Sequence, residues 1–147
     1  MLMQFFQHEM DYVLFLYGFA FIVLAAICLI LKNEKDRLLR WGWLAAFGIL
    51  HGIHEWFDML AVSLGADHRL SAVQLVVLVL SYLAILEFGR VNYTIRNGKK
   101  LWALIHVLVL ILAGFGAFAG LDGLHASARY TIGLPAAILA ALAVISC

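Results

Sequence analysis

Residues 41–64 read WGWLAAFGILHGIHEWFDMLAVSL, an apolar stretch of membrane-spanning length that nevertheless contains four ionisable side chains. These are His51, His54, Glu55 and Asp58, and their spacing of i, i+3, i+4 and i+7 places all four on one face of a helix. An ionisable group near the centre of a bilayer costs roughly 2.5–3.5 kcal/mol on insertion scales. We therefore expect this face to meet protein, water or a ligand rather than acyl chains.

The rest of the chain is equally apolar. Of its 147 residues, 65% are hydrophobic and 13% are charged, and the mean hydropathy is +1.00. Too few polar residues remain to cover the surface of a soluble domain. Five segments of about 20 residues match the thickness of a bilayer core; they are residues 12–31, 41–64, 70–88, 101–120 and 132–147. We predict one all-α integral membrane domain over residues 1–147, a bundle of five transmembrane helices.

The basic residues indicate the orientation of this bundle. Eight of the ten lie in two of the four connections: Lys32, Lys35, Arg37, Arg40, Arg90, Arg96, Lys99 and Lys100. The positive-inside rule makes these connections cytoplasmic and puts the N-terminus outside. Basic residues beside membrane helices meet anionic lipid headgroups, so we expect the lipid bilayer as partner and no nucleic acid. The bacterial cytoplasmic membrane is the expected location.

Small residues predict close helix contacts. Gly48 and Gly52 form one pair at a spacing of four, and Gly116 and Gly120 form another. The only proline, Pro135, is expected to kink or start the last helix. That helix, residues 132–147, is short and has no polar stop. We therefore expect a fragment of a longer membrane protein, or an end covered by partners in a homo-oligomer or larger assembly.

Two further side chains accompany the four ionisable ones. Trp56 is adjacent to them in sequence, and Gln74 lies at the same expected depth as Asp58. Most histidines and several carboxylates fall on the outer half of the bundle. These residues predict a polar pocket that opens to the outside and is lined by His51, His54, Glu55, Trp56, Asp58 and Gln74. At the other end, Glu87 and Arg90 are spaced for an ion pair.

Four interpretations of this cluster remain open. A metal is compatible with His51, His54 and Glu55, although the order His-x-x-His-Glu is not that of the metalloprotease motif. Haem ligation by His51 and His106 would need two histidines at similar depth, and these differ by about 7 Å. The third interpretation is a pocket for a proton or a polar ligand, and the fourth is a purely structural network. The cofactor stays unknown, with metal or haem not favoured. No catalytic motif is present, so we do not expect an enzyme.

Three short segments resemble a known class of proteins. HGIHEWFDM (residues 51–59), EFGR (87–90) and GLDGLHASARYTIGLPAA (120–137) resemble the N-terminal multipass membrane region of certain bacterial sensor histidine kinases and diguanylate cyclases. The resemblance implies a bundle of about seven or eight helices that senses a signal for cytoplasmic PAS, kinase or cyclase domains. His51, Glu55 and Trp56 match its pattern. This chain departs from it, with five helices and no effector domain.

The sequence thus predicts a signal-input or ligand-sensing module of a two-component type of sensor, whose helix packing shifts when the charge or occupancy of the pocket changes. The alternative is a small integral subunit of a larger membrane complex, metal- or haem-binding.

Overall fold

The chain folds into six α-helices over the residues that the structure describes. The computed structural model describes residues 2–33, 39–65, 67–97 and 104–145, with only the backbone of residues 2–8, 96 and 97. The helices are α1 (Leu2–Lys32), α2 (Trp41–Leu64), α3 (His68–Asn97), α4 (Leu104–Gly114), α5 (Gly120–Ala128) and α6 (Leu134–Ile145). A 3₁₀ turn, η1 (Phe115–Ala119), joins α4 to α5, and a π-helical turn, η2 (Arg129–Gly133), joins α5 to α6. The described residues include no strand, which confirms the all-α prediction.

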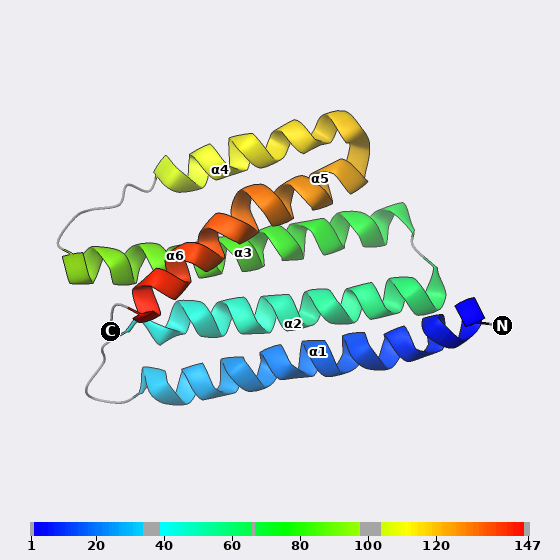
Figure 1. The fold of residues 1–147 in the computed structure, drawn as a ribbon, viewed down its shortest axis with the longest axis horizontal. Coiled ribbons are helices and arrows are strands. Elements are labelled where there is room, and N and C mark those ends of the chain that lie inside the picture. Colours follow the sequence, from blue (N-terminus) through cyan, green and yellow to red (C-terminus); the bar gives the residue numbers. More distant parts are fainter. Residues whose placement is uncertain (1, 34–38, 66, 98–103, 146–147) are drawn as a thin grey trace.

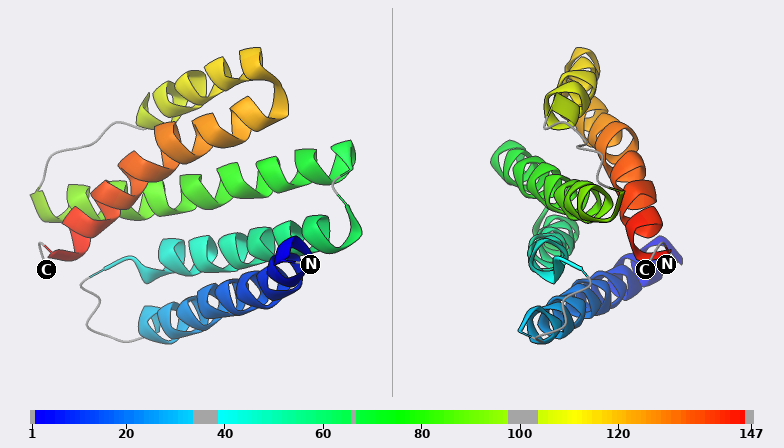
Figure 2. Two further views of the ribbon diagram at one scale, coloured as in Figure 1. Left: turned by 45° about the vertical axis from the view of Figure 1, so that its right-hand side comes forward. Right: turned by 90° about the vertical axis from the view of Figure 1, so that its left-hand side faces the viewer.

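The helices run alternately up and down the molecule. Helices α1, α2 and α3 lie side by side, and α4 forms a hairpin with the C-terminal arm, which we define as α5, η2 and α6 (Figure 1). The arm packs against α3, so α3 lies between α2 and the arm (Figure 2). The main core cluster is accordingly built from α3, α4 and the arm around Leu86, Val109 and Ile132.

Three stretches of the described residues are long and apolar enough to cross a membrane. They are Glu9–Lys32, His68–Ile95 and Leu104–Ile145, so the prediction of a transmembrane protein is confirmed at this level. The third stretch is not one straight rod, because the chain reverses direction at η1 and returns as the arm (Figure 1). Helix α2 has a similar length but is not among the three, because its ionisable side chains lower its mean hydropathy.

Some helix boundaries differ from the prediction. Helix α2 has the predicted bounds, whereas α1 starts ten residues earlier and α3 continues to Asn97 instead of ending at residue 88. Helix α4 ends at Gly114 instead of residue 120, and the last helical arm begins at Gly120 instead of residue 132. Polar residues continue a helix beyond its apolar part, so an apolar run marks the membrane-buried portion and not the helix ends. Residues 101–103, 146 and 147, and Lys35, Arg37, Lys99 and Lys100, lie outside the described residues.

The arm passes Pro135 without ending. Proline has no N–H, and its ring collides with the carbonyl four residues earlier in a regular helix. The chain widens just before this point, where the N–H of Leu134 donates to the carbonyl of Arg129 five residues back. The Thr131 hydroxyl also donates to the Ser127 carbonyl at 2.8 Å. A π-helical turn therefore accommodates the proline, and the helix continues.

Glycines set the closest contacts between helices. A Cβ on Gly52 would lie 2.8 Å from the carbonyl oxygen of Gly18, and one on Gly48 would lie 2.7 Å from that of Phe21. Both glycines thus lie where α2 crosses α1. In the hairpin, Gly116 packs against Gly123 instead of pairing with Gly120.

Gly120 has a different role from the predicted one. It has a φ of 76° and open space where a Cβ would be. Its left-handed conformation ends η1 and turns the chain into α5, which is a task that glycine performs at little steric cost.

Candidate polar site on helix α2

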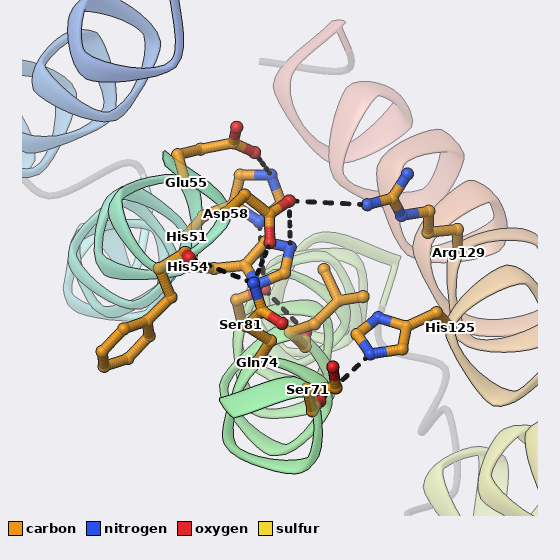
Figure 3. Close-up of polar contacts among 11 residues, drawn as sticks. His51, His54, Glu55, Asp58, Ser71, Gln74, Ser81, His125 and Arg129 are labelled. Atoms are coloured by element: carbon orange, nitrogen blue, oxygen red, sulfur yellow. Dashed lines mark hydrogen bonds and ion pairs between the residues drawn. The ribbon is translucent and has the colours of Figure 1, made fainter. Parts of the chain in front are cut away.

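The four ionisable residues of α2, which we call the polar face, point into the molecule. His51, His54 and Glu55 are buried, and the Asp58 side chain is 28% exposed. Figure 3 shows them directed towards α3 and the arm, away from the outer surface of α2. Two pairs form along the helix, since His51 Nε2 lies 3.5 Å from Glu55 Oε1 and His54 Nε2 lies 3.5 Å from Asp58 Oδ2. Each pair has the i, i+4 spacing that brings side chains together on a helix.

Helix α3 supplies a hydroxyl partner for the first pair. The Ser81 hydroxyl donates to the Leu78 carbonyl at 2.7 Å, and Ser81 Oγ lies 3.1 Å from His51 Nδ1. Because the Ser81 proton is used, Oγ accepts from Nδ1–H. A neutral His51 would then present a bare Nε2 to Glu55, and two acceptors do not attract each other. The contact is therefore attractive only when the pair holds one further proton, and at 3.5 Å it is an electrostatic approach and not a hydrogen bond.

Asp58 is the most connected member of the polar face. Gln74 Nε2, on α3, donates to Asp58 Oδ1 at 2.9 Å and to the Phe57 carbonyl at 3.1 Å. From the arm, Arg129 Nη2 lies 3.8 Å from Asp58 Oδ2 (Figure 3). Together with His54, this single carboxylate joins three parts of the structure: α2, α3 and the first residue of η2.

The arm makes a second polar contact nearby. His125 Nε2 lies 3.2 Å from the Ser71 carbonyl at the start of α3. His125 and Arg129 are one turn apart, so both face α3 and α2 from the same side of the arm (Figure 3). The sequence places both residues near the outer side, but it does not pair them with α2 or α3.

The ring nitrogens of His54 have only weak polar contacts within the described part of the chain. Its residue is 1% exposed, and neither ring nitrogen has a hydrogen-bond partner among the described residues. The contact of 3.5 Å to Asp58 is an electrostatic approach and not a hydrogen bond. Buried polar groups almost always have a partner in proteins, so each exception requires an explanation. The network is therefore incomplete at this histidine.

Trp56 lies away from the polar face, contrary to the prediction that it lines the pocket. Its Nε1 donates to the Phe15 carbonyl at 3.3 Å, and its ring stacks on Phe15 with centroids 6.3 Å apart. It therefore packs against α1, close to Gly18. The reason is geometric: consecutive helical residues point about 100° apart, so Trp56 cannot share a face with Glu55.

The metal and haem hypotheses find no support in the geometry. The described part of the chain contains no group of three or more His, Cys, Asp or Glu side chains placed to hold a metal ion. His106, the other haem candidate, lies 3.3 Å from Glu87 Oε2. Glu87 is six residues, or about 9 Å, along α3 from the Ser81 that contacts His51. The two histidines therefore occupy different depths.

The predicted ion pair of Glu87 and Arg90 is confirmed. Arg90 Nε donates to Glu87 Oε2 at 2.7 Å, and Arg90 Nη2 lies 2.5 Å from Glu87 Oε1. The sequence did not indicate that His106 of α4 joins this pair. Two grooves also lie at this end of the bundle.

We compared the chain with protein-family models, curated proteins and solved structures, and found no match in any of the three comparisons. The resemblance to bacterial sensors thus stays a prediction, and the functional argument depends on the geometry of the polar face.

Proposed function

We propose that this chain is the signal-input module of a membrane sensor, and that the polar face of α2 responds to a proton or a small polar ligand from the outer side. In this proposal all five predicted segments cross a bacterial cytoplasmic membrane with the N-terminus outside. The 24 residues of α2 extend about 36 Å, which is enough to cross. Its polar face is covered by α3 and the arm, so α2 could cross without exposing charge to lipid.

The observation that carries the proposal is the buried imidazole of His54, which Asp58 and the Gln74 backbone approach without forming a hydrogen bond of good geometry. A purely structural network would satisfy its most buried member, because an unpaired buried polar group costs roughly 1–3 kcal/mol. A site that awaits a proton or a ligand would leave such a group open. The pair of His51 and Glu55, one turn away, supports the same interpretation, because its contact is attractive only when the pair holds a further proton.

The connections of Asp58 offer a route for the response. A change of charge at the polar face alters the attraction between Asp58 and Arg129, and Arg129 begins the π-helical turn. Such turns are found frequently at functional sites. We therefore expect the arm to move relative to α2 when the polar face gains a proton or a ligand.

Protons are the probe with which this proposal is tested. Spin labels on Val62 and Tyr130, both exposed, would report the distance between α2 and the arm in a cysteine-free background reconstituted in nanodiscs. We expect the parent distance to change between pH 5 and pH 8 (roughly the range in which histidine titrates). The titratable groups concerned are His51, His54, Glu55 and Asp58 of α2, Tyr82 of α3, and His125 and Arg129 of the arm.

Glu55→Gln removes the carboxylate of the His51–Glu55 pair. The pH-dependent change in distance should therefore disappear, or its midpoint should shift by more than one pH unit. Glu87→Gln is the matched control, because it makes the same chemical change at a carboxylate outside the polar face, and it should respond like the parent. A parent distance that is independent of pH, or identical behaviour of the two variants, would contradict the proposal.

A further inference from the structure

Two adjoining grooves lie at the basic end of the bundle. The first has a volume of about 350 Å³ and is lined by Lys32, Arg40, Trp41 and Trp43, among others. The second has a volume of about 370 Å³ and is lined mainly by apolar side chains of α2 and α3, among them Leu50, Leu80, Leu83 and Ala84. Trp43 and Ala46 line both grooves, so the grooves meet on one face of α2.

The first groove is cationic. The side chain of Lys32 lies over the first turn of α2, with Nζ 3.9 Å from the position that a Cβ on Gly42 would take. Neither Lys32 nor the Arg40 guanidinium makes an ion pair with a residue that the structure describes. The N-terminus of α2 also has no side-chain cap, so its dipole adds to the positive potential. An anion would complete this groove.

The second groove continues away from the cations. Along α2 it runs from Trp43 to Leu50, and along α3 from Glu87 to Leu80, so on both helices it leads from the basic end towards the middle of the bundle. Its polar members, Glu87 and His106, lie at the basic end and contact each other. The ion pair with Arg90 neutralises Glu87. Beyond these residues the lining is apolar.

The grooves are cationic at the helix ends and apolar towards the centre of the bundle. This arrangement is complementary to one anionic phospholipid in its leaflet, whose phosphate lies at the surface and whose acyl chains extend towards the bilayer centre. We propose that the two grooves together bind an anionic phospholipid, whose phosphate lies between Lys32 and Arg40 and one of whose acyl chains follows the second groove. Trp43, which is 45% exposed where the grooves meet, would lie at the level of the glycerol backbone. Tryptophan favours this interfacial depth.

Bromine on an acyl chain quenches nearby tryptophan, which allows a direct test. A variant with Trp43 as its sole tryptophan, reconstituted in phosphatidylcholine nanodiscs, would be titrated with dibrominated phosphatidylglycerol or with dibrominated phosphatidylcholine. We expect the anionic lipid to bind several-fold more tightly. Lys32→Gln should reduce this preference about fivefold, the effect of one basic side chain at a membrane surface. Lys32→Arg should restore it.

Two controls separate a built site from diffuse attraction. Arg69→Gln removes an exposed charge from the other end of α3 and should leave the preference unchanged. Ala46→Phe fills the shared part of the grooves and should weaken the quenching by both lipids several-fold without changing the preference between them. Equal quenching by the two lipids in the parent, or equal losses in Lys32→Gln and Arg69→Gln, would overturn the proposal. So would an Ala46→Phe variant that is quenched as strongly as the parent.

Discussion

Replacement of His54 by leucine should leave the protein equally or more stable while abolishing its response. His54 is fully buried and makes no hydrogen bond within the described residues. Leucine has a similar size, so the packing change should cost less than about 1.5 kcal/mol. The removal of an unsatisfied buried polar group offsets this by roughly 1–3 kcal/mol. The net change in the free energy of unfolding should lie between about zero and 3 kcal/mol in favour of the variant.

Gln74→Leu provides the contrast, because Gln74 makes two hydrogen bonds to α2. Interhelical hydrogen bonds in membrane proteins contribute about 0.6–1.7 kcal/mol each. Their loss should destabilise the protein by about 1–3 kcal/mol, and it also removes a donor from Asp58. His54→Leu and Gln74→Leu should therefore differ by about 1 kcal/mol or more, although both substitutions exchange one buried polar side chain for the same apolar one.

Reversible unfolding in mixed micelles at one pH measures both free energies. The spin-label distance between α2 and the arm, recorded in parallel, should lose its pH dependence in His54→Leu. If His54→Leu is destabilised as much as Gln74→Leu, then the native imidazole has partners and the polar face is a structural network. A His54→Leu variant that is stable and still responds to pH would show that the response arises elsewhere.

Three further substitutions test the packing and the basic end by the same unfolding assay. Gly52→Ala should destabilise the protein by about 1–3 kcal/mol, because its Cβ would lie 2.8 Å from the Gly18 carbonyl oxygen. Gly114→Ala should stabilise the protein by about 0.5–1 kcal/mol, because Gly114 has open space around it and a helical φ of −60°. Similar effects of the two substitutions would refute the close contact at Gly52. Glu87→Gln should lower the free energy of unfolding by about 1 kcal/mol, and by less at high salt, because the partners Arg90 and His106 are partly exposed. A loss of stability that does not depend on salt would contradict this prediction.

The features that depend on one helix were predictable from the sequence. The bounds of α2 follow from an apolar run between a basic connection and a glycine. The common direction of His51, His54, Glu55 and Asp58 follows from helical periodicity alone. The same holds for Glu87 and Arg90, which are one turn apart. Spacing determines which side chains of one helix can meet, and no tertiary information is needed.

The features that depend on two helices were not predictable. The sequence pairs Gly116 with Gly120 by spacing, but η1 ends at Ala119, and the chain turns back at Gly120 so that Gly123 becomes the partner. Trp56 was assigned to the polar face by adjacency, whereas its ring is directed to α1. The contact of His106 with Glu87 joins α3 to α4 across a connection that has no motif. Each of these contacts depends on how two helices are rotated relative to each other.

The link between the polar face and the arm has the strength that a reversible response requires. Arg129 is 54% exposed at its side chain and lies 3.8 Å from Asp58, so this pair is worth at most about 1 kcal/mol. The bond from Gln74 to the same carboxylate is shorter, at 2.9 Å, and more buried. A proton or ligand that weakens the charge of Asp58 would therefore loosen the contact between the arm and α2 before it separates α2 from α3, while the core keeps the arm packed on α3. Because a signal can shift an equilibrium only by its differential affinity, a contact this weak is within reach of a single proton.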